Sequence, residues 1–400
     1  MDMPMTTSET TLSKLPALLQ ELGRRLGREF LAKDEIIRLL LISVVAGEHM
    51  LIVGPPGTAK SALVRTLAQK LDARYFEYLL TRFSEPNELL GPVDIQAFRE
   101  GTFRRRTEHM LPEAELAFLD EIFKASSAIL NSLLGLLNER RVQIGAERID
   151  VPLLALFAAS NEVPSDDSLA ALLDRFLLRV RSHNLEGFHF QQLVKFGLQH
   201  EKKLLDGASG LVQTTPAPLL SAKDILLLRR ELATRLQFSD EFLSEYKSLV
   251  AQIRSEGIFV SDRRLIKLLK LCAASALLDG RPQADVSDLF VLKHTWNSVE
   301  QAEILAGVVD PLLRRHRLAT DQPSRRDAQG LAAMLEELAT LRLGLQRAGE
   351  LSDVQLFAKL RTLGELRAAL QLHSSDESQR AVRDIDALLD SLVSGAPLGG

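Results

Sequence analysis

Residues 54–61 combine glycines, a lysine and a hydroxyl group at a spacing that suits the phosphates of a nucleotide. The segment GPPGTAKS resembles the phosphate-binding pattern G-x-x-x-x-G-K-[ST], except that Ala59 replaces the second glycine. In such a loop the backbone N–H groups surround the β- and γ-phosphates. Lys60 adds a mobile positive charge, and the Ser61 hydroxyl offers an oxygen to Mg²⁺.

The alanine departs from the common pattern without contradicting its chemistry. Position 59 leads directly into the next helix, so we expect right-handed helical backbone angles there, which a methyl group tolerates. Gly54 and Gly57 let the backbone approach the phosphate oxygens, because no Cβ stands in the way. We therefore predict that ATP contacts the loop residues Gly54, Pro55, Pro56, Gly57, Thr58, Ala59, Lys60, Ser61 and Ala62.

Two acidic residues follow the loop by about 60 residues, at the end of the apolar run LAFLDEI. Asp120 at the tip of a strand can hold Mg²⁺ together with Ser61, directly or through water. Glu121 can orient and polarise the water that attacks the γ-phosphate. A strand that ends in two acids is common by itself, but combined with the loop it predicts ATP hydrolysis.

Strand and helix signals alternate in a way that would place both segments on one sheet. Continuous apolar runs at 48–54, 114–121 and 151–162 are typical of strands covered on both faces. Helical periodicity follows the first run at 60–75 and the second at 124–141. The fold class expected is therefore α/β, with a parallel sheet flanked by helices. Two further helices are predicted before the first strand, at 12–27 and 32–47.

Two hairpins and a helical second half complete the expected organisation. One hairpin is predicted at 95–107, turning at Glu100–Gly101, and the other at 140–151, turning near Gly145. Strand signals stop near residue 186, and 188–317 is mostly helical in pattern. After a polar linker at 319–327, three amphipathic helices are expected before a disordered tail.

Composition limits the classes of function. A net charge of −4 over 400 residues gives no overall electrostatic footprint for nucleic acid. The most apolar stretch, IIRLLLISVVAG, contains Arg38 and is too short to span a bilayer. The single cysteine, Cys272, excludes an intrachain disulfide, and the N-terminus lacks a secretory pattern. A cytoplasmic protein without membrane contact is expected.

Several segments in order resemble the MoxR family of AAA+ ATPases, and most of all its RavA (regulatory ATPase variant A) subfamily, in which alanine before the lysine is typical. The resemblance covers roughly residues 15–315. It rests on the segments GPPGTAKS, YLLTRFSEPNELLGPVDI, LAFLDEIFKASSAILNSLLGLLNERR, FAASNE, LLDRFLLRV and SDRRLIKLLKL. The resemblance implies a P-loop AAA+ core at 1–186, an all-α lid domain at 187–318 and a C-terminal helical module at 319–400.

The resemblance also implies roles for three further residues. Asn161 matches the sensor 1 amide, Arg175 the arginine finger that reaches a neighbouring subunit's ATP, and Arg263 the sensor 2 arginine of the lid. An amide can hydrogen-bond the attacking water, and a guanidinium can stabilise charge on the transferring phosphoryl group. Arg179 competes with Arg175 for the finger role, and Arg264 stands beside Arg263.

A ring is implied by a finger that acts in trans, and in this superfamily rings are typically hexamers. The segment at about 93–110 corresponds to the helix-2 insert of this clade, and its arginines 104–106 either contact a substrate or form a solvated edge. Relatives usually act on a client protein with a von Willebrand factor A-domain partner. The best-known relative also carries a β-rich module, and no strand-rich segment follows residue 320 here.

Three functions remain open from the residues. The leading hypothesis is a ring-forming, chaperone-like ATPase that couples ATP and Mg²⁺ to remodelling or activation of a client protein. A nucleic-acid motor is the second, since helix-2-insert proteins include helicases, although the low net charge makes nucleic acid an unlikely partner. The third is an oligomeric scaffold that ATP merely switches, in which Glu121 would be dispensable.

Overall fold

The structure is a computed structural model. It describes residues 7–145, 147–164, 169–184, 217–320 and 376–394, with isolated residues between 194 and 202 and short stretches between 334 and 371. The chain divides into two compact units, of which the first contains residues 1–184 and 215–320 and the second residues 185–214 and 321–400.

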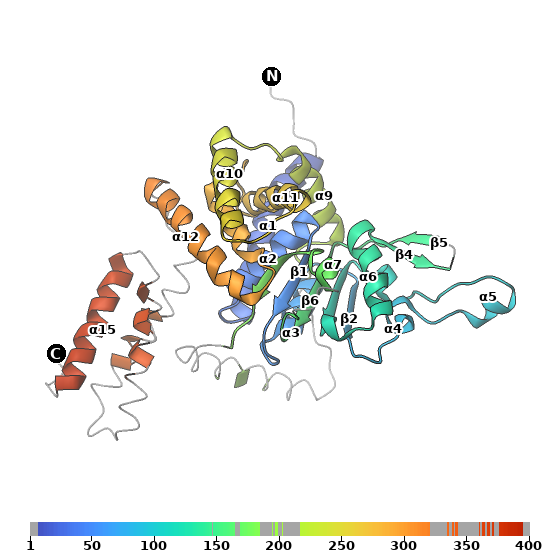
Figure 1. Cartoon of the computed structure of the whole chain (residues 1–400), viewed down its shortest axis with the longest axis horizontal. Coiled ribbons are helices and arrows are strands. Elements are labelled where there is room, and N and C mark those ends of the chain that lie inside the picture. Colours follow the sequence, from blue (N-terminus) through green and yellow to red (C-terminus); the bar gives the residue numbers. More distant parts are fainter. Residues whose placement is uncertain are drawn as a thin grey trace. The chain divides into compact units, whose positions relative to one another are not determined.

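A five-stranded parallel sheet forms the centre of the first unit (Figure 1). Its strands lie in the order β2-β3-β6-β1-β7. Its strands are β1 (His49–Val53), β2 (Tyr75–Leu79), β3 (Leu116–Asp120), β6 (Ala155–Ser160) and β7 (Phe176–Arg181). β1, β3 and β6 are the apolar runs predicted from the sequence, and each is buried along nearly its whole length. Parallel strands share one direction, so all five carboxyl ends lie at the same edge.

Helices cover both faces of the sheet, as such a buried sheet requires. They include α1 (Thr7–Glu29), α2 (Asp34–Ala46), α3 (Lys60–Lys70) and α6 (Ser127–Glu139). The predicted fold class, an α/β core flanked by helices, is confirmed. The sequence patterns did not predict β2 and β7, although YFEYL is rich in the aromatic residues that favour strands and FLLRV is mostly apolar.

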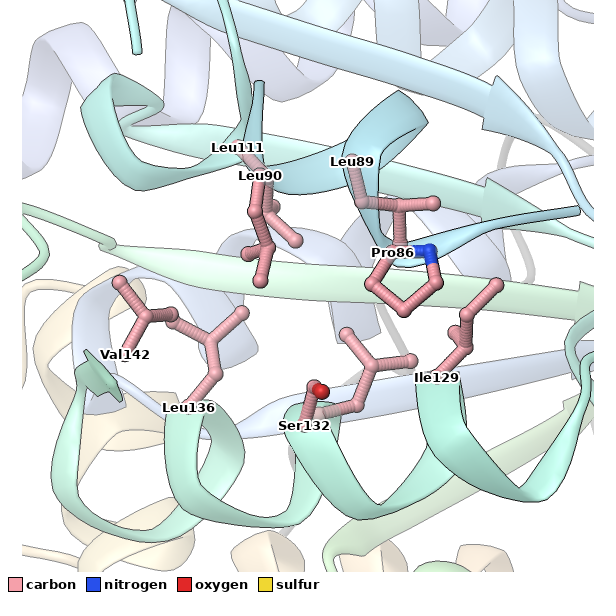
Figure 2. Close-up of a pocket in the computed structure, with 9 residues that line it drawn as sticks. Pro86, Leu89, Leu90, Leu111, Ile129, Ser132, Leu136 and Val142 are labelled. Atoms are coloured by element: carbon pink, nitrogen blue, oxygen red, sulfur yellow. The ribbon is translucent and has the colours of Figure 1, made fainter. Parts of the chain in front are cut away.

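A short helix, α4 (Pro86–Leu90), packs against the buried face of α6. Figure 2 shows Leu89 and Leu90 facing Ile129, Ser132 and Leu136 across a cavity of about 10 Å³. That volume holds at most one water molecule, and apart from Ser132 its lining is apolar. The cavity is a packing gap in the core rather than a ligand site, and the apolar contact fixes α4 on α6.

Two projections leave the sheet beside α6, and only one is the hairpin that was predicted (Figure 1). β4 (Arg141–Ile144) and β5 (Glu147–Asp150) pair antiparallel around Gly145 at φ 62°, as expected. At 95–107 the hairpin prediction is wrong: a short helix, α5 (Ile95–Arg99), forms instead, and the pairing is reduced to one bridge between Val93 and Arg105.

Local hydrogen bonding explains the short helix. The Asp94 carboxylate accepts from the backbone N–H groups of Gln96 and Ala97, which starts a helix at the position where a strand was expected. Ile95 and Phe98 are 66% and 61% exposed, so α5 lacks the buried face that would have enforced strand alternation.

The lid helices start at side-chain caps. They are α9 (Ala222–Thr234), α10 (Asp240–Ser255), α11 (Asp262–Leu278), η5 (Val286–His294) and α12 (Val299–Thr320). Ser221, Ser239 and Ser261 each accept a hydrogen bond from a backbone N–H in the first turn of α9, α10 and α11, respectively. The helical pattern predicted for 188–317 is found from residue 222 onward and at the isolated described residues between 194 and 202, whereas the rest of 188–216 lies outside the described residues. The predicted linker begins inside α12, which extends to Thr320, and its remainder also lies outside the described residues.

Charged contacts join the lid to the core. Arg38 of α2 binds both carboxylate oxygens of Asp279 at 2.9 Å, just after α11 ends. Glu48, which precedes β1 and is 3% exposed, accepts from Lys267 at 2.7 Å and also from Lys270. The lysines lower the pKa of Glu48 against the opposing effect of burial. The first turns of α11 therefore lie beside the amino-terminal end of β1.

The second unit has its own apolar core. α15 (Asp376–Ser394) contributes Ala381, Ile385 and Leu388, which pack with Leu363, Leu366 and Leu370. The last of the three predicted C-terminal helices is therefore present. The other two fall largely outside the described residues, as does the predicted disordered tail. Among the helices in the described ranges, none is long and apolar enough to cross a membrane.

His49, the first residue of β1, is expected to make folding stability sensitive to acid. Its Nδ1 accepts from the Leu156 N–H at 3.0 Å and its Nε2–H donates to the Leu137 carbonyl at 3.1 Å, a pattern that needs neutral imidazole. Burial, followed by the charge of Arg140, lowers its pKa from 6.5 to about 3. The unfolded chain therefore binds this proton more tightly, and stability falls as the pH drops below 6.5 toward 3.

We expect His49 to account for about 2 kcal/mol of the unfolding free energy lost between pH 7 and pH 5. His49→Gln keeps one donor and one acceptor but cannot titrate, so the loss over this interval should shrink by that amount. Denaturant unfolding of both proteins at both pH values measures the difference. An equal loss in the two proteins would show that His49 does not set the acid sensitivity.

Candidate nucleotide-hydrolysis site

The phosphate loop connects the carboxyl end of β1 to the start of α3. Gly54 N–H donates to the Ser160 carbonyl at 3.0 Å, and a Cβ added to Gly54 would lie 2.1 Å from the Ser182 carbonyl oxygen. Glycine is therefore required at 54 because β6 and the end of β7 enclose the backbone. Next to Gly57, at φ 82°, there is open space, so this part of the loop is free to surround phosphates.

Lys60 is positioned under this loop. It is 8% exposed, and its Nζ donates to the Gly54 and Pro55 carbonyls at 2.8 and 2.9 Å. Burial lowers the pKa of Lys60, while the nearby carboxylates of Asp120 and Glu121 oppose that shift. The two motifs predicted to act together thus lie within electrostatic reach of each other.

Ala59 does not have the backbone angles that the sequence analysis assigned to it. Its φ of 61° and ψ of 26° are left-handed, and it stands immediately before the first residue of α3. The right-handed expectation was wrong, because the loop must reverse direction before the helix can begin. A non-glycine residue in this region carries a strain of about 1 kcal/mol, which a single methyl group, exposed here, can sustain.

Glu121 and Asn161 are brought together across neighbouring strands. The Asn161 amide donates to one Glu121 oxygen at 2.6 Å, and Lys124 lies 3.4 Å from the other. Glu121 has a φ of 54°, a turn that directs the chain away from the sheet right after β3. Its own N–H donates to Asp120 Oδ1 at 3.0 Å. This carboxylate is positioned to act on a water near the loop.

The donor set suits Mg²⁺ bound jointly with nucleotide phosphates. Asp120 and Ser61 would hold the ion, which when bound neutralises phosphate charge. Mg²⁺ typically uses one or two protein oxygens and completes its shell with phosphates and water. No group of three or more acidic, histidine or cysteine side chains that could hold a metal occurs among the described residues.

Arg175 lies at the opposite edge of the sheet from the phosphate loop. It immediately precedes β7, which runs parallel to β1 for six residues, so roughly 16 Å of strand separates it from the loop edge. Its Nη1 contacts the Asp174 carboxylate at 3.2 Å, and its side chain is 22% exposed. This guanidinium is beyond reach of a nucleotide bound on the same subunit.

The structure also separates the other candidate arginines from the loop. Arg263 Nη2 donates to Asn138 Oδ1 at 3.2 Å, at the end of α6 and near the start of β1. Arg179 is 0% exposed, and its guanidinium donates to backbone carbonyls on both sides, so it cannot extend into a neighbouring subunit. Of the two finger candidates, only Arg175 has a partly exposed side chain.

Lys33 is a residue near the site that the sequence analysis missed. It precedes α2 and is buried, and its Nζ donates to Ser182 Oγ at 3.0 Å and to the His183 carbonyl at 2.9 Å. Burial and the charge of Lys60 lower its pKa. Lys33 therefore lies close to the phosphate loop and braces the end of β7 that encloses Gly54. No motif marks it, because its proximity arises only from the folding of α2 against β7.

Comparison with known proteins agrees with this geometry. Residues 17–215 match the MoxR domain of the MoxR–vWA–β-propeller ternary systems, and residues 223–309 match an AAA lid domain. An uncharacterized protein of Methanocaldococcus jannaschii is 36% identical over 286 residues, which cover 71% of this chain and 73% of that protein. The chain belongs to the MoxR family of AAA+ ATPases.

Two further comparisons are more distant. The chaperone MoxR1 of Mycobacterium tuberculosis is 26% identical over 157 residues, which cover 38% of this chain and 41% of that protein. The crystal structure of a candidate ATPase from Cytophaga hutchinsonii has a TM-score of 0.59, covers 77% of this chain and 97% of its own, and is 21% identical. This structural likeness supports the AAA+ fold, with its parallel sheet and lid.

Two substitutions in the loop are expected to differ in their effect on ATP binding. Gly54→Ala places a Cβ 2.1 Å from the Ser182 carbonyl, so the loop must shift and ATP binding should weaken at least about tenfold. Ala59→Gly removes the left-handed strain of the folded loop but raises the conformational entropy of the unfolded chain. The two free-energy effects are of similar size, so ATP binding and folding stability should both change little. Titration with a fluorescent ATP analogue measures both. Wild-type affinity in Gly54→Ala would contradict this account of the loop.

Proposed function

We propose that this chain is a ring-forming MoxR-type ATPase, closest to RavA proteins, that couples Mg²⁺-dependent ATP hydrolysis to remodelling or activation of a client protein. Asp120 and Ser61 would hold Mg²⁺, Glu121 would activate water, and Asn161 would orient that carboxylate and the water. A relative that is named a chaperone supports a client protein, and a domain named for MoxR–vWA systems supports a von Willebrand factor A-domain partner. A hexamer in the cytoplasm is part of the proposal.

Ring formation is supported mainly by one observation, which is that the functional groups are divided between the two edges of the sheet. The phosphate loop, the acidic pair and Asn161 lie at the carboxyl edge, whereas Arg175 and Arg263 lie toward the amino edge. A head-to-tail contact would bring the amino edge of one subunit to the loop of the next. Arg175, and with it Arg263, would then supply positive charge to the neighbour's transferring phosphoryl group.

Mixing two inactive variants tests this arrangement. Arg175→Ala keeps Glu121 but lacks the finger, and Glu121→Gln keeps the finger but cannot activate water. Each alone should lose at least about 1,000-fold in kcat. Mixed rings should regain measurable hydrolysis, because an Arg175→Ala subunit receives the finger of a Glu121→Gln neighbour. A steady-state ATPase assay across mixing ratios reads this out. No recovery at any ratio would contradict a finger acting in trans.

Affinity capture tests the client. Glu121→Gln should hold ATP and stay assembled, so a client or partner should remain bound, whereas Lys60→Ala should bind neither ATP nor client. Mass spectrometry of material recovered with the two baits, in excess ATP, compares them. A protein specific to Glu121→Gln supports remodelling. Enrichment of nucleic acid would favour a nucleic-acid motor instead, and identical recovery with both baits would contradict ATP-gated binding.

A further inference from the structure

Two buried arginines meet at the contact between the lid and β7. Arg179 of β7 is 0% exposed, and Arg264 of α11 is 4% exposed. Both donate to Asn297 Oδ1, at 2.9 and 3.0 Å, and both donate to the Thr295 carbonyl, at 3.3 and 2.8 Å. Arg179 also donates to the Trp296 carbonyl. We call Arg179, Arg264 and Asn297 the arginine clamp.

The arginine clamp continues into the turn that carries the candidate finger. The Nη2 of Arg179 donates to the Leu173 carbonyl at 2.6 Å. Leu173 ends α7 (Ala170–Leu173), and the next two residues are Asp174 and Arg175. The Arg179 guanidinium therefore contacts the lid segment, residues 295–297, on one side and the backbone of the finger turn, residues 173–175, on the other. The Arg175 side chain is held in turn by Asp174.

Stability alone does not explain this arrangement. Burial, followed by the neighbouring charge of Arg264, lowers the pKa of Arg179 to about 9, and only Asp174 acts in the opposite sense. Two like charges that share neutral oxygens cost more than apolar side chains of similar volume would. The planar guanidinium does, however, reach two sets of acceptors in fixed directions. A feature that is costly for folding but precise in geometry is characteristic of a positioning function.

The lid segment itself is tied to the rest of the lid. The Asn297 N–H donates to Gln301 Oε1 of α12 at 2.8 Å, which fixes the position of Asn297 relative to α12. Arg264 is in the first turn of α11. Displacement of α11 or α12 relative to β7 would therefore change the acceptors of Arg179. The Leu173 carbonyl, and with it the finger turn, would lose its fixed position.

We propose that Arg179 and Asn297 are positioning residues that couple the lid of one subunit to ATP hydrolysis in the next. The arginine clamp holds the turn at Leu173–Arg175, so the orientation of the lid decides whether Arg175 is presented to the neighbouring nucleotide. The inference rests on the proposed trans action of Arg175 and adds a route by which one subunit's lid controls its neighbour.

Mixed rings separate a positioning role from a general structural one. In the donor arrangement, Glu121→Gln/Arg179→Lys is mixed with Arg175→Ala, so the altered clamp stands behind the only working finger. In the acceptor arrangement, Arg175→Ala/Arg179→Lys is mixed with Glu121→Gln, so the altered clamp stands behind a finger that is absent. A lysine keeps the charge but cannot reach both sets of acceptors.

We expect the donor arrangement to lose about 100-fold of the recovered ATPase rate, since misplacement by about 1 Å can have that effect. The acceptor arrangement should retain the recovered rate, which also shows that Arg179→Lys folds and assembles. Asn297→Ala, altered on the lid side, should reproduce this asymmetry. Arg181→Lys, an exposed position two residues further along β7, is the matched control and should retain recovery in both arrangements.

Equal loss in both arrangements, for both clamp variants, would overturn the inference in favour of a structural role. Equal recovery in both would overturn it as well, because the finger would then not depend on the clamp. If the parent mixture of Glu121→Gln and Arg175→Ala recovers nothing, the trans finger itself is wrong, and the inference falls with it. The parent mixture thus distinguishes failure of the proposed function from failure of the clamp.

Discussion

The common direction of the five strands is the constraint on which the rest of the structure depends. Parallel pairing places the ends of β1, β3 and β6 at one edge, and those ends carry the phosphate loop, the acidic pair and Asn161. The same pairing places the residue before β7 at the other edge. An antiparallel β7 would put Arg175 beside the loop of its own subunit. The neighbouring subunit that the proposed function requires is thus a consequence of strand direction.

The lid is held to the core by buried charges at several points. Lys267 and Lys270 neutralise Glu48 before β1, Arg38 pairs with Asp279, and the arginine clamp contacts β7. Hydrogen-bonded charges have stricter geometric requirements than apolar contacts, because each guanidinium or carboxylate accepts few arrangements. The lid is therefore fixed in a defined orientation on α2, β1 and β7. Such contacts are candidate two-state elements for the lid movement on which the proposed coupling between subunits depends.

The phosphate loop combines one obligatory glycine with one tolerated alanine, and their surroundings explain the difference. Gly54 is enclosed by the backbone of Ser160 and Ser182, where no Cβ fits. Ala59 is exposed at the mouth of α3, where a methyl group meets solvent and the only cost is its left-handed conformation. Sequence alone presents both positions as the glycines of one pattern. Their difference arises from β6 and β7, which are remote in the chain.

The sequence by itself determined the elements whose signals are local. The apolar runs of β1, β3 and β6, the turn at Gly145 and the phosphate and acidic motifs can all be identified within short windows, because propensity, turn chemistry and periodicity act over a few residues. Local signals were insufficient at α5, where the Asp94 cap replaced a strand, and at Ala59, where loop closure imposed left-handed angles.

Only the tertiary structure decided which distant residues meet. It placed Lys33 near the phosphate loop, joined Glu121 to Asn161, buried Arg179 while leaving Arg175 partly exposed, and separated Arg263 from the loop. These outcomes depend on strand order and on the packing of the lid against α2 and β7. Some of these contacts join residues more than a hundred positions apart, and no local pattern in the chain encodes them.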